Sequence, residues 1–359
     1  MKIKTLLALA LVLPALACAS SGDDGPSADA ASALTFDAAL ERIDSEGLME
    51  KASVLAADSM RGRNTPSPEI EATAEWIASR MEAAGLEPGA KDGTFIQRYT
   101  APPFDPETAP NVVAVLPGSD PGLADEYVVY SAHMDHVGVR EPRGESTDSI
   151  WNGADDNASG TVTLMEVAEA MAAMAPGERP RRSMMFLWVS GEERGLLGSA
   201  AFASDPSVPV ESMVANFNVD MVGRNWTDTI VAIGKEHSDL GAIMNRVNDA
   251  NPEIGMTAID DIWPEENFYR RSDHFNFARR GVPVLFFFNG THEDYHQASD
   301  EVGKLDTEKM ARIGRLLFLL GAEVGNADAR PQWNADSYED IVDMAPAGDM
   351  PPASGTAGG

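Results

Sequence analysis

Continuous runs of apolar residues, separated by segments with helical periodicity, constrain this chain most strongly. Runs that do not alternate with polar residues predict strands that are covered on both faces. They are Asn111–Leu116, Tyr127–Ser131, Ser183–Val189, Met213–Val219, Thr229–Ile233 and Val282–Phe288. Strands that alternate with helices form a mostly parallel sheet. The sequence therefore predicts an α/β fold in which helices cover both faces of a mostly parallel, twisted sheet.

Helical segments flank and separate these runs. The expected helices are Phe36–Asp58, a helix that starts at Ser67-Pro68, Thr161–Ala175, Leu196–Ala203, Leu240–Ala250 and Leu305–Val324. Together with the strands they predict a single domain over residues 35–325. Residues 326–359 are rich in Pro, Gly, Ala and Asp, which predicts a disordered tail.

The N-terminus has the pattern of an export signal. Lys2 and Lys4 precede the apolar stretch Leu6–Leu16, which is too short to span a bilayer. We expect a signal peptide over residues 1–17 and a flexible tether over residues 18–34. Cys18 resembles the lipidated cysteine of bacterial lipoproteins, although Ala15 and Ala17 would also suit ordinary signal peptidase. The chain is therefore expected to be exported, either as a cell-envelope lipoprotein (periplasm or outer membrane) or as a secreted protein.

Composition excludes two kinds of site. The formal net charge of −30 argues against nucleic-acid binding, because acidic side chains far outnumber the basic side chains that would neutralise phosphates. Cys18 is the only cysteine, so disulfides and thiolate metal sites are excluded. Contact with a membrane is expected only through a lipid anchor on Cys18.

Residues that can bind metal ions follow the apolar runs. The carboxyl ends of parallel strands meet at one edge of a sheet, where α/β proteins bind their ligands. His133 follows the run Tyr127–Ser131, and Asp220 follows the run Met213–Val219. The later runs and one loop add Glu192, Glu193, Tyr295, His296, Asp155 and Asp156. Random acidic decoration would be scattered over both edges, so this pattern predicts a metal site at one edge.

The residue types suit two divalent ions, with zinc favoured. Imidazole and carboxylate ligands are typical of zinc, and a bridging carboxylate can hold two ions together. Glu192 and Glu193 are adjacent and point in different directions, so one can bind an ion while the other contacts a bound water. Asp135 lies two residues after His133, where it could accept the free N–H of that imidazole.

Six motifs together resemble the exported di-zinc aminopeptidases of metallopeptidase family 28, which include bacterial leucyl aminopeptidases. The motifs are SAHMDHVG (131–138), NGADDNASG (152–160), SGEERGLLGS (190–199), NFNVDMVG (216–223), RSDHFNF (271–277) and YHQASD (295–300). The resemblance is specific over residues 111–301 and weaker over residues 36–110. It implies a single catalytic domain without a protease-associated insert, because only a dozen residues separate Tyr99 from Val112.

The resemblance also implies a role for each site residue and two zinc ions per chain. The implied metal ligands are His133 and Asp220 for one zinc, Glu193 and His296 for the other, and Asp156 as the bridge, followed by a cis peptide bond. The implied catalytic residues are Glu192 as general base, Asp135 as the residue that orients His133, and Tyr295 as a donor to the oxyanion. The expected enzyme is a metallo-aminopeptidase that acts on peptides, with a monomer favoured.

Several alternatives remain open at this stage. Asp155 could replace Asp156 as the bridge, because the two are adjacent. We expect His136 at the rim of the site, and a structural or pocket-shaping role for Asp273 and His274. A carboxypeptidase, a dipeptidase or a glutaminyl cyclase could use the same scaffold. A binding module without activity is disfavoured, because no motif residue is missing.

Overall fold

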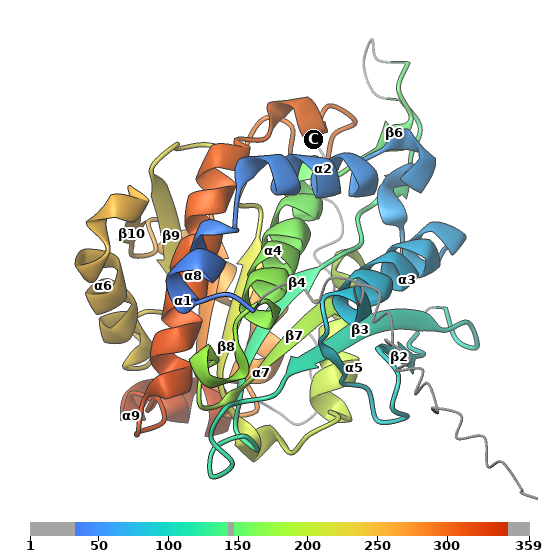
Figure 1. Ribbon diagram of the computed structural model, residues 1–359. Coiled ribbons are helices and arrows are strands. Elements are labelled where there is room, and N and C mark those ends of the chain that lie inside the picture. The colour runs from blue at the N-terminus through green and yellow to red at the C-terminus, as the bar shows by residue number, and fades with distance from the viewer. Residues whose placement is uncertain (1–32, 103, 143–146, 344–359) are drawn as a thin grey trace, which may run out of the picture. The chain divides into compact units, whose positions relative to one another are not determined.

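The computed structural model describes residues 33–102, 104–142 and 147–343 (Figure 1). The chain divides into two units at Leu34, and the fold below is that of the second. The predicted signal peptide, Cys18 and nearly all of the predicted tether lie outside the described residues, so those predictions are not tested. No helix in the described part of the chain is long and apolar enough to cross a lipid bilayer.

A mixed sheet forms the centre of the fold. Among the described residues it contains nine strands, of which eight follow the order β1-β3-β7-β4-β8-β11-β9-β10, and β2 pairs with β3. They are β1 (Glu87–Pro88), β2 (Ile96–Tyr99), β3 (Ala109–Leu116), β4 (Tyr127–His133), β7 (Ser183–Val189), β8 (Met213–Asp220), β9 (Thr229–Ile233), β10 (Thr257–Ile259) and β11 (Val284–Phe288). The four central strands β7, β4, β8 and β11 are parallel, which confirms the predicted mostly parallel sheet. A small separate sheet pairs β5 (Gly138–Val139) with β6 (Ile150–Trp151).

Two hydrophobic cores cover the two faces of the sheet. In β7, Phe186 and Trp188 belong to one core, whereas Leu187 and Val189 belong to the other. Residues of six helices contribute to the first core: α1 (Phe36–Glu41), α2 (Ser45–Leu55), α3 (Pro68–Ala83), α4 (Gly160–Ala172), α6 (Leu240–Ala250) and α8 (Thr307–Asn326). Figure 1 shows α4 and α8 side by side. The second core contains α5 (Leu197–Ser204) and α7 (His274–Ala278). Burial on both faces explains why the strands are apolar throughout.

The predicted helix Phe36–Asp58 is wrong in one respect, because it consists of two helices. α1 ends at Glu41, and α2 begins at Ser45. Asp44 is the N-cap of α2, and its side chain accepts the N–H of Gly47 at 2.8 Å. Asp is one of the residues that favour this position, since its carboxylate satisfies an N–H group that has no partner within the helix.

The predicted disordered tail is wrong for residues 327–343. α9 (Ala335–Tyr338) and the turn Glu339–Asp343 follow α8. The indole N–H of Trp333 donates to the carbonyl oxygen of Gly281 at 2.8 Å, and Ile341 is buried in the second core. The packed domain therefore continues beyond the predicted boundary at residue 325. The rest of the predicted tail, residues 344–359, lies outside the described residues.

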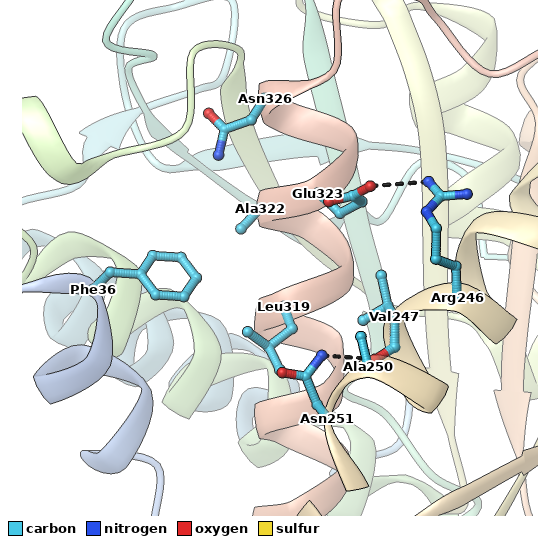
Figure 2. A pocket seen from close by; sticks show the side chains of 9 residues that line it. All are labelled: Phe36, Arg246, Val247, Ala250, Asn251, Leu319, Ala322, Glu323 and Asn326. Atoms are coloured by element: carbon cyan, nitrogen blue, oxygen red, sulfur yellow. Dashed lines mark hydrogen bonds and ion pairs between the residues drawn. The ribbon is translucent and has the colours of Figure 1, made fainter.

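A pocket lies between α1, α6 and α8 (Figure 2). Phe36, Val247 and Leu319 supply apolar walls, and an ion pair joins Arg246 to Glu323 at 2.9 Å. None of the predicted site residues lines this pocket. It is therefore distinct from the site described next.

Candidate metal centre

The predicted ligands meet at the carboxyl edge of the parallel strands. His133 is the last residue of β4, and Asp220 is the last residue of β8. Glu193 lies in a short turn directly after β7, and Asp156 lies in the loop that leads into α4. His296 follows β11 and has a positive φ of 52°. Parallel pairing of the central strands places these segments together, as the order of the apolar runs predicted.

One group of potential ligands contains His133, Asp156 and Asp220. Nε2 of His133 lies 3.1 Å from Oδ1 of Asp220 and 3.4 Å from Oδ1 of Asp156. All three side chains are buried. Two carboxylates and one imidazole nitrogen thus face a common point.

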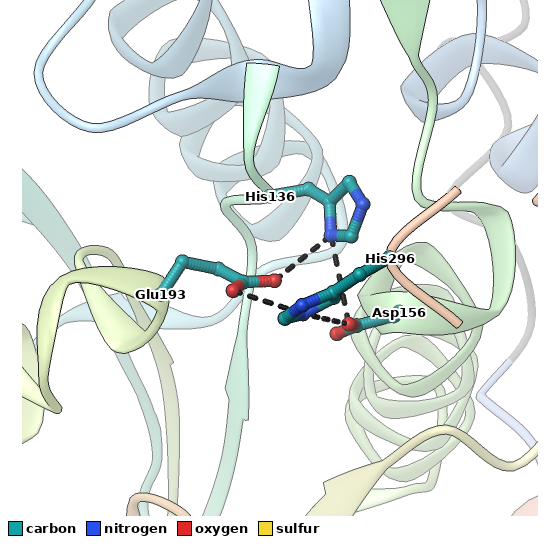
Figure 3. Close-up of side chains that lie close together, drawn as sticks. All are labelled: His136, Asp156, Glu193 and His296. Carbon is teal, nitrogen blue, oxygen red and sulfur yellow. Dashed lines mark ion pairs between the residues drawn. The ribbon is translucent and has the colours of Figure 1, made fainter. Parts of the chain in front are cut away.

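A second group contains His136, Asp156, Glu193 and His296 (Figure 3). Nε2 of His296 lies 3.1 Å from Oδ2 of Asp156 and 3.1 Å from Oε2 of Glu193. Nδ1 of His136 lies 2.9 Å from Oε1 of Glu193 and 3.6 Å from Oδ2 of Asp156. Asp156 is the one residue that the two groups share, with one oxygen facing each. The expectation that His136 lies at the rim is wrong, because its side chain is 0% exposed.

The chemistry of the two groups fits zinc. Buried polar atoms are almost always hydrogen-bonded, yet both ring nitrogens of His136 and Oε1 of Glu193 have no hydrogen-bond partner within the described structure. Burial lowers the pKa of His296, but Asp156 and Glu193 outweigh this effect and raise it to about 11. The carboxylates therefore create a site that favours a cation. Imidazole and carboxylate ligands suit zinc.

Comparisons with known proteins agree with this geometry. The model of Peptidase family M28 matches residues 111–320, which is more than half of the chain. The chain belongs to peptidase family M28. The predicted family is therefore confirmed, and so is the prediction of an enzyme that hydrolyses peptide bonds.

The relatives of this M28 peptidase include fungal and bacterial proteins. A probable leucine aminopeptidase of Arthroderma otae is 26% identical over 263 residues, which are 71% of this chain and 67% of that protein. Leucine aminopeptidase 1 of Fusarium vanettenii is 27% identical over 286 residues, 76% of this chain and 67% of that protein.

Solved structures support the fold. The Legionella pneumophila LapA aminopeptidase has a TM-score of 0.63 at 22% identity and covers 81% of this chain and 75% of its own. BSAP, a zinc aminopeptidase from Bacillus subtilis, has a TM-score of 0.59 at 15% identity, covering 77% of this chain and 94% of its own. The predicted α/β fold is confirmed by these similarities and by the sheet itself.

Asp135 connects His133 to the segment that carries Glu192. Nδ1 of His133 lies 3.2 Å from the backbone carbonyl oxygen of Asp135 and 3.7 Å from its carboxylate, so the carbonyl is the nearer acceptor. The carboxylate accepts the N–H of Glu192 at 3.3 Å and the hydroxyl of Thr65 at 3.1 Å. Thr65 in turn accepts the N–H of Gly191 at 3.1 Å. Asp135 therefore fixes the approach of Glu192 as well as the imidazole.

Other residues contact the potential ligands or belong to the loop that carries Asp156. Ser272 donates its hydroxyl to Oδ2 of Asp220 at 3.0 Å. The peptide bond between Asp156 and Asn157 is cis, as the resemblance implied. Asp155 accepts a hydrogen bond from His292 at 3.1 Å and belongs to neither ligand group, so the geometry favours Asp156 as the shared carboxylate.

Arg63 is a supporting residue whose structural role was not predicted from the sequence. Its guanidinium is fully buried and donates to the backbone carbonyl oxygens of Leu55, Met134, Asn152 and Gly153 at 2.5–3.0 Å. Burial lowers the pKa of Arg63 to about 10, against the opposing effect of carboxylates that include Asp135 and Asp156. Arg63 therefore joins the segment after β4 to the loop before Asp156.

Glu192 and Tyr295 lie beside the two ligand groups. Burial raises the pKa of Glu192 well above its usual range, although His133 opposes the shift. Burial, together with Asp156 and Glu193, also raises the pKa of Tyr295, so its hydroxyl keeps its proton.

Asp273 and His274 were expected to have a structural or pocket-shaping role. Burial raises the pKa of Asp273 to about 7. Nε2 of His274 donates to the backbone carbonyl oxygen of Tyr269 at 2.7 Å, and His274 belongs to neither group, which agrees with a structural role.

Proposed function

We propose that this M28 peptidase is a zinc aminopeptidase that holds two zinc ions per chain. The observation that carries the proposal is the position of Asp156. Its two oxygens face separate ligand groups, which is the arrangement that a bridging carboxylate needs. The proposed ligands are His133 and Asp220 for the first ion, Glu193 and His296 for the second, and Asp156 for both.

Zinc, when bound, supplies a Lewis acid that polarises a carbonyl group and makes water more acidic. The residues of the chain then handle protons. Glu192 takes a proton from the attacking water and gives it to the leaving amine. Its raised pKa suits a group that must accept a proton and release it again. Asp135 holds the backbone N–H of Glu192 and thereby sets its position.

Tyr295 is the proposed donor to the oxyanion of the tetrahedral intermediate. Its raised pKa keeps the hydroxyl protonated beside the carboxylates of Asp156 and Glu193. Its ring stacks on that of His296 with centroids 4.0 Å apart, which restricts where the hydroxyl can lie. A positioned donor of this kind lowers the energy of the transition state more than that of the substrate.

The metal centre favours removal of N-terminal residues. The carboxylates of Asp156, Glu193 and Asp220 would be neutralised by two zinc ions, so attraction of a positive amine is not the reason. A free α-amine in its neutral form is a nitrogen ligand that a zinc ion with an open position would accept. We therefore propose peptides with a free N-terminus as substrates.

The test combines metal analysis of the purified protein with a panel of substrates. We expect two zinc ions per chain, hydrolysis of amino-acid anilides, and no hydrolysis of the same anilides after N-acetylation. Release of C-terminal residues from N-blocked peptides would indicate a carboxypeptidase instead. Cyclisation of N-terminal glutamine with one zinc per chain would indicate a cyclase, and absence of any turnover would indicate a binding module.

The N-terminal sequence supports a separate proposal on location. Lys2, Lys4 and the apolar stretch Leu6–Leu16 form an export signal, and Cys18 is the proposed site of a lipid anchor. Mass spectrometry of the mature N-terminus tests this. A lipid-modified Cys18 supports an envelope lipoprotein, and an unmodified N-terminus that begins after Ala17 supports secretion. Size-exclusion chromatography tests the expected monomer.

A further inference from the structure

We propose that His136 is an additional ligand of the second metal ion, so that the two ions are held unequally. This inference rests on the proposed two-zinc function. The second ion then has four protein ligands, His136, Asp156, Glu193 and His296, whereas the first has three, His133, Asp156 and Asp220.

The ring of His136 is packed into the second ligand group. It is fully buried, and its Nδ1 lies 2.9 Å from Oε1 of Glu193. Figure 3 shows its ring facing Glu193 and His296, and the two imidazole centroids are 5.6 Å apart. Gly153 makes room for the ring, since a Cβ at that position would lie 2.4 Å from Cγ of His136. The loop that carries Asp156 is thus built against this imidazole.

The contact between His136 and Glu193 is an ion pair that lacks the geometry of a hydrogen bond. Neither Nδ1 of His136 nor Oε1 of Glu193 has a partner with hydrogen-bond geometry among the described residues, although the two atoms are close. Two buried atoms left in this state are costly. A cation that both atoms face would satisfy them together, and Asp156 and His296 already face the same point.

The number of ligands predicts different roles for the two ions. Zinc held by four protein ligands is typical of closed sites, whereas zinc held by three keeps a position open for water or substrate. The second ion is therefore the tightly held one, and the first is the one that exchanges more readily and offers the open position. His136 creates this difference.

The test uses His136→Asn in the full-length protein. Asparagine keeps an N–H donor near the position of Nδ1 but removes the imidazole, so it distinguishes a ligand from a donor that only orients Glu193. The control is His237→Asn, which removes a half-buried histidine that contacts Ser337 instead of the site. Zinc affinity is measured by competition with a chelator, and Co²⁺-substituted protein reports coordination through its visible absorption. Thermal melting checks that each variant is folded.

The wild type and His237→Asn are expected to bind two ions with two distinct affinities. His136→Asn is expected to bind its tight ion at least about tenfold more weakly and to change the Co²⁺ spectrum. Should a folded His136→Asn keep both affinities and the wild-type spectrum, His136 is not a ligand, while the proposed function stands. Fewer than two ions in the wild type would overturn the proposed function and this inference together. If His136→Asn does not fold, the same comparison is made with His136→Gln.

Discussion

Oδ2 of Asp300 accepts the backbone N–H of Asp156 at 3.1 Å. The same carboxylate accepts the N–H of Asp155, with both oxygens at 3.0 Å. Asp300 is buried, and burial followed by the charge of Asp155 raises its pKa to about 6. The backbone of Asp156, the proposed shared ligand, is therefore held in place by a second carboxylate from the segment after His296.

Replacing Asp300 tests this support. Asp300→Asn keeps the size of the side chain but leaves one acceptor oxygen for the N–H groups of Asp155 and Asp156. We expect zinc affinity to fall roughly 10- to 100-fold, as is typical when a residue that orients a ligand is lost. Chelator competition measures the change. Asp249→Asn is the matched control, because Asp249 is exposed. Equal zinc affinities in the two variants would show that Asp300 does not support the metal site.

Glu192→Gln separates metal binding from proton transfer. The amide cannot accept the proton of the attacking water, but Glu192 belongs to neither ligand group. We expect both zinc ions to remain and kcat to fall by about 10²- to 10⁴-fold. Metal analysis and anilide hydrolysis on the same preparation measure the two effects. Near-normal turnover would exclude Glu192 as the general base.

The positions of His133 and Asp220 could be predicted because they depend on local pattern. Each follows an apolar run, and continuous runs of this kind form buried parallel strands whose ends meet. The burial of His136 could not be predicted in this way. It lies one residue beyond Asp135 in a loop, and its side chain is enclosed by Gly153 and Glu193, which are distant in sequence.

The roles of supporting residues also could not be predicted from local sequence patterns. Arg63 makes its hydrogen bonds to segments 71–90 residues away as well as to Leu55, so its role depends on how three segments pack. The composition of residues 327–343 is that of a tail. Of the two side chains that anchor it, Trp333 is an isolated apolar residue, and Ile341 belongs to a group of three, Tyr338, Ile341 and Val342, that is too short to predict a packed helix. In both cases tertiary contacts determined the outcome.

Arg63→Met should destabilise the protein and weaken the metal site. Methionine fills part of the volume but leaves four buried carbonyl oxygens without their donor. We expect the free energy of unfolding to fall by about 3 kcal/mol or more, because each unsatisfied buried group costs about 1–3 kcal/mol. Urea unfolding measures the loss, and chelator competition measures zinc affinity.

Two further variants test how specific this role of Arg63 is. Arg63→Lys keeps the charge but not the planar fork of donors, so only a partial recovery is expected. Arg61→Met is the control, because the side chain of Arg61 is 56% exposed. A full recovery in Arg63→Lys would mean that charge alone, and not the pattern of hydrogen bonds, is required.

His274 should make the protein sensitive to acid. Burial lowers its pKa to about 3, while in the unfolded chain the value is about 6.5. As the pH falls from 6.5 towards 3, the unfolded chain takes up a proton that the folded protein does not. The free energy of unfolding therefore decreases in this range, by at most about 1.4 kcal/mol per pH unit from this residue.

The pH dependence is measured by urea unfolding of chelator-treated protein, so that loss of zinc does not contribute. His274→Gln keeps a polar group that can contact the carbonyl oxygen of Tyr269 but cannot be protonated. Its free energy of unfolding should depend less steeply on pH between 6.5 and 4 than that of the wild type. Identical slopes would show that His274 is not held in its neutral form.

Asp156→Asn and Asp220→Asn should differ in how many ions they lose. Asp156 faces both ligand groups, whereas Asp220 faces one. An amide oxygen is a weaker ligand than a carboxylate, and an amide nitrogen is not a ligand at all, so Asp156→Asn should lose both ions or bind them far more weakly. Asp220→Asn should lose the first ion and keep the second. Metal analysis after dialysis gives the stoichiometry, and two retained ions in Asp156→Asn would contradict a bridging role, because one oxygen cannot serve both groups.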